Sequence, residues 1–448
     1  MKVFFLLIIL LPFISSAQSI SAGGGHSYAI CDDSTAMAWG YNDDGALGHC
    51  CGFGSMVGLT GVKNISGGRN NTLILKNDGT VWATGLNNYG QCGNGSTTDI
   101  YIPEQITGLS NVSSISAGFY HSLALKSDGT VWAWGINGNG ELGNGTNINS
   151  NIPVQIAPLT SIVAIAAGWG YSFALKGDGT VWAWGDNSYG LLANGSNISS
   201  NIPLPVSGLI GATSIVCGFA HSLALRNDST VVAWGFNSSG QLGDGTTTNS
   251  NVPVAVVGLS GITSVKTGWA HSLALKDDSI VWAWGSNSQG QLGNATNISS
   301  NVPVSINALT SVNSIAAGAY HSLALQNDGI VWAWGENGYG ELGNGTSTNS
   351  NIPVEVVGLC DIATNNNEIV SAVDVLIFPN PSSGIFTVNL SEKNAKICVY
   401  DIVGRCVLEK DHRDAQVVTM DLNGRSKGIY FMKIVSDDNR WVEKIVLQ

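Results

Sequence analysis

Five histidines stand at one recurring position of the chain, and each is followed directly by a serine: His26, His121, His221, His271 and His321. A histidine beside a hydroxyl is the arrangement with which nucleophilic hydrolases activate their serine. Asn71 and Tyr171 occupy the same position in two further copies. A pair that recurs around a set of copies indicates a structural hydrogen-bonding device, so we expect no catalytic residue and no enzyme here.

Two segments, 138–143 and 338–343, match the dinucleotide-binding pattern G-x-G-x-x-G. Dinucleotide binding needs a helix after the glycines, with its N-terminus facing the pyrophosphate. Here a further Gly- and Asn-rich loop follows, so the glycines are interpreted as turn residues. An Asp also recurs at one position of the copies, as at Asp128, and it is likewise explained by a hairpin turn. The cysteines form no CxxC pair, which argues against zinc, and we expect no metal and no cofactor.

The first seventeen residues are interpreted as a signal peptide. Lys2 gives a positive start, 3–14 form an apolar core, and 15–17 are small residues suited to cleavage. About a dozen apolar residues are too few to cross a bilayer, which takes ~20. Export to an oxidising compartment allows the eight cysteines to pair, and the sequence leaves their pairing open. We expect no transmembrane segment in the mature chain.

A repeat of about fifty residues organises the chain from 18 to 361. The motif Trp-x-Trp-Gly ends at Gly135, Gly185, Gly285 and Gly335, and variants end at Gly40, Gly85 and Gly235, which makes seven copies. Each copy contains four short runs of alternating residues separated by turn residues, and none has the period of a helix. Seven such copies predict a seven-bladed β-propeller, and an open solenoid is the structural alternative. The paired tryptophans of the motif are expected in the core between blades.

The run AGxxHSLALKxDGTVWAWGxNxxGQLGNGT, found with small changes at 117–146 and 267–296, resembles the regulator of chromosome condensation repeat. That resemblance covers 19–361 and implies a seven-bladed propeller. The founder of that family exchanges nucleotide on a small GTPase and binds chromatin. We do not expect this role here, because residues 18–361 carry 8 Lys and Arg against 20 Asp and Glu. An acidic, exported propeller lacks the basic surface that nucleic acid requires.

The pattern changes after a polar linker at 362–374. Residues 375–448 show new alternating runs that predict a small β-sandwich. Their motifs resemble the C-terminal sorting domain of type IX secretion substrates, and the residues that carry the resemblance are Pro379, Asn380, Pro381, Gly384, Tyr400, Asp401, Gly404, Gly428 and Tyr430. The resemblance implies passage through the periplasm, recognition by the type IX machinery, and a product released or attached to the outer cell surface.

Aromatic residues vary from copy to copy in the two positions before the recurring histidine, and Tyr171 stands at the histidine position itself. We expect these residues on one rim of the propeller as ligand-binding residues: Phe119, Tyr120, Trp169, Tyr171, Phe219, Trp269 and Tyr320. Rigid aromatic side chains are common at protein hot spots. The leading hypothesis is therefore a monomeric binding protein for an extracellular protein or glycan. Two alternatives stay open, an extracellular hydrolase or lyase that uses an acidic channel and a passive surface or adhesion component.

Overall fold

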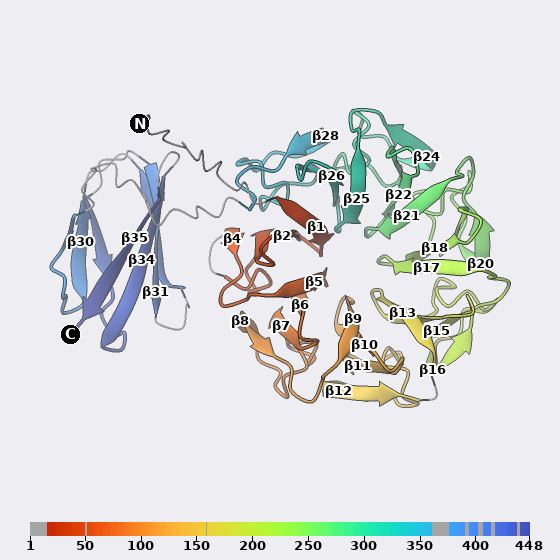
Figure 1. The fold of residues 1–448 in the computed structure, drawn as a ribbon, viewed down its shortest axis with the longest axis horizontal. Coiled ribbons are helices and arrows are strands. Elements are labelled where there is room, and N and C mark those ends of the chain that lie inside the picture. Colours follow the sequence, from red (N-terminus) through yellow and green to blue (C-terminus); the bar gives the residue numbers. More distant parts are fainter. Residues whose placement is uncertain are drawn as a thin grey trace, which may run out of the picture.

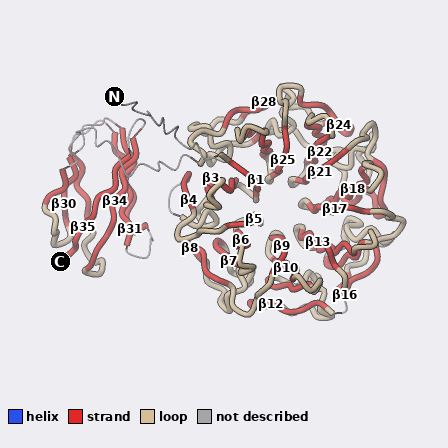
Figure 2. The backbone as a smooth tube through the Cα atoms, viewed as in Figure 1, coloured by secondary structure: helices blue, strands red, loops and turns tan. Residues whose placement is uncertain are grey.

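The computed structural model describes residues 16–49, 52–157, 159–360, 376–389, 394–401, 406–413, 417–436 and 440–448. Every regular element in these ranges is a strand, and none is a helix (Figure 2). The predicted all-β fold class is therefore confirmed. Most of the predicted signal peptide and the whole predicted linker lie outside the described residues, although Ser16 and Ala17 are described and Ala17 begins the first strand.

Each copy of the repeat folds into one antiparallel sheet of four strands, as the third copy illustrates. Strand β10 (His121–Lys126) pairs with β11 (Val131–Gly135) through a tight hairpin. Asp128 forms the turn because its Oδ1 accepts hydrogen bonds from the amide and the hydroxyl of Thr130, at 3.0 and 2.6 Å. Gly129 follows with a φ of 78°, which a glycine adopts without steric cost.

Seven such sheets follow one another along the chain. Their strands are β1 (Ala17–Ala22), β2 (His26–Cys31), β3 (Ala36–Gly40) and β4 (Phe53–Ser55); β5 (Val62–Gly67), β6 (Asn71–Lys76), β7 (Val81–Gly85) and β8 (Ile100–Gln105); β9 (Val112–Ala117), β10, β11 and β12 (Ser150–Ile156); β13 (Ile162–Ala167), β14 (Tyr171–Lys176), β15 (Val181–Gly185) and β16 (Ser200–Pro205); β17 (Ala212–Cys217), β18 (His221–Arg226), β19 (Val231–Gly235) and β20 (Ser250–Ala255); β21 (Ile262–Thr267), β22 (His271–Lys276), β23 (Val281–Gly285) and β24 (Ser300–Ile306); and β25 (Val312–Ala317), β26 (His321–Gln326), β27 (Val331–Gly335) and β28 (Ser350–Glu355). Figure 1 shows them arranged as blades around a central channel, with the first strand of each sheet innermost.

The ring closes between the first and the seventh blade without any exchange of strands. Both sheets keep their strands in chain order, β1-β2-β3-β4 and β25-β26-β27-β28. A disulfide between Cys31 and Cys360 links the two blades across 329 residues of sequence. One pair of the cysteines whose pairing the sequence left open is thereby assigned, and Cys92 and Cys217 keep their thiols.

The hydrophobic core lies between neighbouring blades. In one such layer Leu123 and Leu125 of the third blade pack with Ile165 and Trp184 of the fourth. The second tryptophan of each motif is fully buried, as Trp134 and Trp184 are. The first tryptophan differs from the prediction, because Trp132 and its equivalents Trp182, Trp282 and Trp332 are only half-buried. They lie at the edge of the core, where Lys126 approaches the Trp132 ring to 5.6 Å.

The C-terminal residues form a separate pair of sheets. One contains β29 (Leu376–Phe378), β30 (Ile385–Asn389) and β33 (Val417–Asp421), and the other contains β31 (Asn394–Asp401), β32 (Cys406–Arg413), β34 (Gly428–Ser436) and β35 (Arg440–Leu447). Their inner faces share one core, to which Phe386 and Met420 contribute from the first sheet and Ile397 and Met432 from the second. This arrangement is the small β-sandwich that the alternating pattern predicted.

Candidate binding face

One face of the propeller is built at the ends of the inner strands. After each inner strand comes the recurring glycine, and the residue that follows it is carried to the mouth of the channel. At Gly118 an added Cβ would lie 2.6 Å from the carbonyl oxygen of Gly168, so only glycine allows neighbouring blades to approach this closely. The amide of Phe119 donates to the same carbonyl, at 3.1 Å. The blades therefore hold the variable residues in fixed positions.

Four of these variable residues bring their rings together across the mouth of the channel. They come from the third to the sixth blades: Phe119, Trp169, Phe219 and Trp269. Trp169 stacks on Phe219 with their ring centroids 4.7 Å apart. The ring centroid of Phe119 lies 5.5 Å from that of Phe219 and 5.2 Å from that of Trp269. These contacts cross the channel, because Phe119 belongs to the third blade and its two partners belong to the fifth and sixth. The prediction placed these residues around a rim, whereas the structure gathers them into one cluster.

Arg69 occupies the equivalent position in the second blade, and the sequence reasoning did not single it out. Its guanidinium carbon lies 5.0 Å from the centre of the Phe119 ring and 5.5 Å from that of Tyr120. It also donates a hydrogen bond to the Tyr120 hydroxyl. A cation over an aromatic face is stabilised by the ring quadrupole. The signal was available in the repeat register, since Arg69 aligns with Phe119.

Two tyrosines extend the cluster on either side. Tyr120 contacts Phe119 at 5.3 Å, and Tyr320 contacts Trp269 at 5.1 Å, both with edge-on geometry. Burial raises the pKa of Tyr320, with Glu336 nearby. We call Arg69, Phe119, Tyr120, Trp169, Phe219, Trp269 and Tyr320 the aromatic face.

Tyr171 does not belong to this face, although we predicted it as a ligand-binding residue. Its side chain is fully buried. The hydroxyl donates to the backbone carbonyl of His221 at 2.7 Å and accepts from Ser222 at 3.2 Å. Tyr171 stands where other blades have the recurring histidine, and it links the fourth blade to the fifth.

Four of the five recurring histidines link blades in a similar way: His121, His221, His271 and His321. The ring nitrogens of His26 are buried without a hydrogen-bond partner among the described residues. His121 Nε2 lies 2.8 Å from the Oγ of Ser172, the serine of the next blade rather than the one beside it in sequence. Ser172 Oγ gives its single proton to the carbonyl of Glu141, at 3.0 Å, so the imidazole must donate through Nε2. Trp184 Nε1 donates to that same carbonyl, at 2.8 Å. The structural role predicted for the His-Ser pairs is confirmed for these four histidines, whose serine partners belong to the next blade.

Burial keeps these imidazoles neutral. It lowers the pKa of His121 to about 4 and that of His221 to about 3. The Nδ1 atoms of both rings are buried without a hydrogen-bond partner in the part of the chain that the structure describes. A fully buried imidazole whose Nε2 proton is committed to a serine is unsuited to act as a general base on a substrate.

The described residues contain neither a cluster of metal-binding side chains nor a membrane-spanning helix. No group of three or more His, Cys, Asp or Glu side chains there lies close enough to hold a metal ion. Within the same ranges, no helix is long and apolar enough to cross a membrane.

The wall of the channel cavity is not acidic, although the alternative hypothesis of a hydrolase or lyase relied on an acidic channel. The residues that line the channel cavity include Arg69 and Lys266 but no Asp or Glu. The recurring acids lie elsewhere, because Asp78, Asp128 and Asp178 sit in exposed hairpin turns. An acid-catalysed hydrolase or lyase in the channel therefore loses the feature on which it depended.

The sorting motif packs around the end of the chain. Asn380, which stands between Pro379 and Pro381 in the sequence, accepts a hydrogen bond through its Oδ1 from the amide of Val446, at 2.9 Å. The Tyr430 hydroxyl donates to the Ser426 carbonyl at 2.6 Å. Gly384 and Gly428 have positive φ, Tyr400 and Asp401 lie in β31, and Gly404 is outside the described residues.

Comparison with known families supports both halves of this description. The model of the RCC1-like domain matches residues 115–374, and models of the regulator of chromosome condensation (RCC1) repeat match 17–46, 62–91 and 78–125. The model of the secretion system C-terminal sorting domain matches 376–448. This domain implies secretion or a cell-surface location.

Similar proteins share only part of their length with this chain. Protein RCC2 homolog of Danio rerio is 39% identical over 85 residues, which are 16% of this chain and 16% of that protein. Ultraviolet-B receptor UVR8 of Arabidopsis thaliana is 30% identical over 98 residues, 20% of this chain and 22% of the receptor. The chain thus matches less than a quarter of either relative.

Two solved structures superpose on most of this chain. Prp20p from Saccharomyces cerevisiae superposes with a TM-score of 0.65 at 22% identity, covering 78% of this chain and 88% of that one. Human WBSCR16 gives a TM-score of 0.63 at 23% identity, covering 70% and 87%. At these identities the likeness shows the fold alone. Since the matched family model spans more than half of the sequence, the chain belongs to the RCC1-like domain family and ends in a secretion system C-terminal sorting domain.

Proposed function

We propose that this protein is a secreted or cell-surface binding protein, exported by type IX secretion, whose aromatic face engages an extracellular protein or glycan. The observation that carries the proposal is the convergence of Phe119, Trp169, Phe219 and Trp269 from four blades onto one channel mouth. Three of these four side chains keep part of their surface accessible, and only Phe119 is buried. Clustered, rigid aromatics near an arginine are typical of protein hot spots.

The aromatic face also suits its ligand physically. Its side chains are already held by ring contacts and by Arg69, so binding costs little conformational entropy. Flat aromatic surfaces bury large apolar areas against a partner. An interaction with either a protein loop or a sugar ring would use the same surfaces, and the test below separates the two.

The test is a pull-down and a glycan array with the chain from Gln18 to its end. The variant carries Trp169→Ala and Trp269→Ala, and the matched control carries Tyr101→Ala, an exposed aromatic on outer strand β8. We expect a ligand that the wild type and the control retain and the double variant loses, with all three chains folded. Equal retention by the double variant would exclude the aromatic face as the site.

A further inference from the structure

A cavity of about 350 Å³ lies in the channel beside the aromatic face, and all seven blades contribute to its wall. Most of the wall consists of small residues. At the inner-strand position of Lys266 the other blades have Ser21, Ser66, Ser116, Ala166, Val216 and Ala316. Lys266, in β21, is therefore the one long side chain at this level of the ring.

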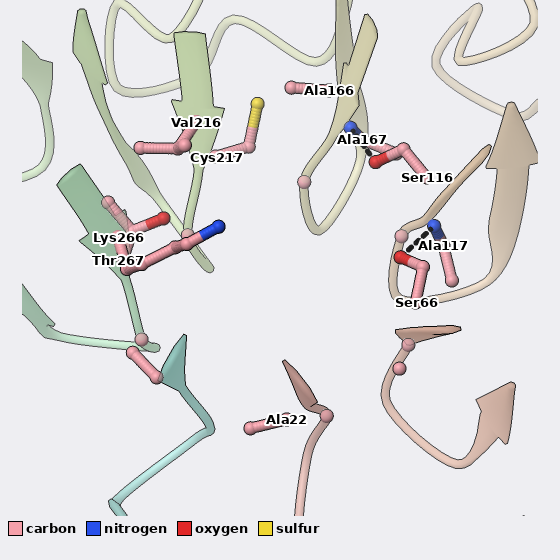
Figure 3. A pocket seen from close by; sticks show the side chains of 18 of the residues that line it. Ala22, Ser66, Ser116, Ala117, Ala166, Ala167, Val216, Cys217, Lys266 and Thr267 are labelled. Atoms are coloured by element: carbon pink, nitrogen blue, oxygen red, sulfur yellow. Dashed lines mark hydrogen bonds between the residues drawn. The ribbon is translucent and has the colours of Figure 1, made fainter. Parts of the chain in front are cut away.

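The ammonium group of Lys266 points into the channel (Figure 3). Neither an ion pair nor a hydrogen bond of this group occurs among the described residues. Burial lowers its pKa, and no carboxylate counters that effect. The Lys266 side chain is half-buried, and its charged end is turned toward the channel rather than toward a partner in the described part of the protein.

The charge of the cavity is opposite to that of the propeller around it. Residues 18–361 contain 8 Lys and Arg against 20 Asp and Glu. Yet Lys266 and Arg69 line the cavity and no acidic residue does. A confined site with low-dielectric walls concentrates such a field. The channel therefore offers an anion a local positive potential within an acidic molecule.

Backbone amides add further donors beside Lys266. In the early blades the serines supply acceptors, since Ser66 Oγ accepts from the amide of Ala117 and Ser116 Oγ from that of Ala167, both at 2.9 Å (Figure 3). In the fourth and fifth blades, Ala166 and Val216 stand at the position of these serines. The equivalent amides, those of Cys217 and Thr267, therefore have no serine hydroxyl at that position of the neighbouring blade to accept from them.

We propose that the channel cavity is an oxyanion-binding site, in which the Lys266 ammonium and the amides of Cys217 and Thr267 bind the carboxylate or sulfate of a small ligand. Ammonium and amide donors together match the acceptor oxygens of such groups. A volume of about 350 Å³ falls in the range of small-molecule pockets, ~300–1,000 Å³. This inference goes beyond the proposed function, because it assigns a charged site inside the channel to Lys266, which is not part of the aromatic face, although residues of that face line the same cavity.

Calorimetric titration of the chain from Gln18 onward tests the site with three probes: glucuronate, sodium sulfate and glucose. Lys266→Gln removes the charge, and Lys276→Gln is the matched control, because Lys276 is a half-buried lysine of the same blade that pairs with Asp278 outside the cavity. We expect saturable binding of an anionic probe and none of glucose. Loss of a charged hydrogen bond predicts roughly 10- to 100-fold weaker binding in Lys266→Gln, with Lys276→Gln unchanged.

The two anions separate the possible sources of the oxyanion. Sulfate binding that competes with glucuronate supports a site for the oxyanion itself, and glucuronate binding alone supports a site that also contacts the sugar. A second readout is NMR titration of the Lys266 ammonium, whose pKa should rise when glucuronate is present. Absence of saturable binding for both anions, equal binding by folded Lys266→Gln, or an ammonium pKa that ignores glucuronate would each overturn the proposal.

Discussion

Mild acid should destabilise the propeller strongly, because five buried imidazoles resist protonation. Burial lowers the pKa of His121 and His321 to about 4, and that of His26, His221 and His271 to about 3. In the unfolded chain each imidazole has a pKa of about 6.5. The unfolded state therefore binds more protons at every pH below 6.5, and stability present above that pH is lost as the pH falls toward 4.

The magnitude follows from these values. Between pH 7 and pH 5, protonation of one imidazole in the unfolded chain lowers the free energy of unfolding by about 2 kcal/mol. Five imidazoles sum to ~10 kcal/mol, comparable with the total stability of an ordinary domain, ~5–15 kcal/mol. Burial raises the pKa of Glu141 and Glu341, and these two carboxyls offset part of the loss at the acid end because they take up protons more readily when folded.

Urea unfolding at 25 °C, followed by tryptophan fluorescence at four values of pH from 7.5 to 5, measures the effect. His121→Asn removes one titrating group and places the residue that blade two has at Asn71. We expect this variant to lose about 2 kcal/mol less between pH 7 and 5 than the wild type. Ser172→Ala is the control, since it deletes the hydrogen-bond partner and keeps the imidazole, so its pH slope should match the wild type. A wild-type stability that stays level from pH 7.5 to 5 would refute the reasoning.

Three further changes test other contacts. Cys31→Ser opens the disulfide to Cys360; releasing so long a loop should lower stability by up to ~5 kcal/mol, and reductant should reproduce the loss in the wild type but not in the variant. Gly118→Ala should cost ~1–3 kcal/mol in urea unfolding because its Cβ meets the Gly168 carbonyl, and an unchanged midpoint would contradict this. Asn71→His should restore a bond to Ser122 and stabilise by about 1 kcal/mol at pH 7.5, a gain that differential scanning calorimetry should no longer find at pH 5.

The fold could be predicted from the sequence because each copy of the repeat independently shows the same pattern of strands and turns. The hairpin at Asp128 and Gly129 and the buried second tryptophan depend on local pattern alone. The outward position of Trp132 could not be inferred in this way, since it depends on where the edge of one sheet meets the next blade. Alternation assigns both tryptophans to one face but does not say how deep each lies.

The candidate site was only partly predictable for a related reason. The register placed Phe119, Trp169, Phe219 and Trp269 at one level of the ring, but contact across the channel depends on its diameter. Tyr171 was misplaced because its neighbours suggested a rim, whereas its register is that of the buried histidines. Lys266 was overlooked because a single lysine in an alternating run resembles any exposed strand residue, and only ring closure turns that side chain inward.

The manner of closure has a consequence for the evolution and engineering of the ring. Every blade is one contiguous stretch of sequence, and no strand is shared between the chain's beginning and its end. The chain therefore connects all neighbouring blades directly except the first and the seventh, and these two are joined by the disulfide between Cys31 and Cys360. A circular permutation of the propeller that starts at any other blade boundary, with the old ends joined by a short linker, would leave all seven sheets intact. It would change only the pair of blades between which the ring closes.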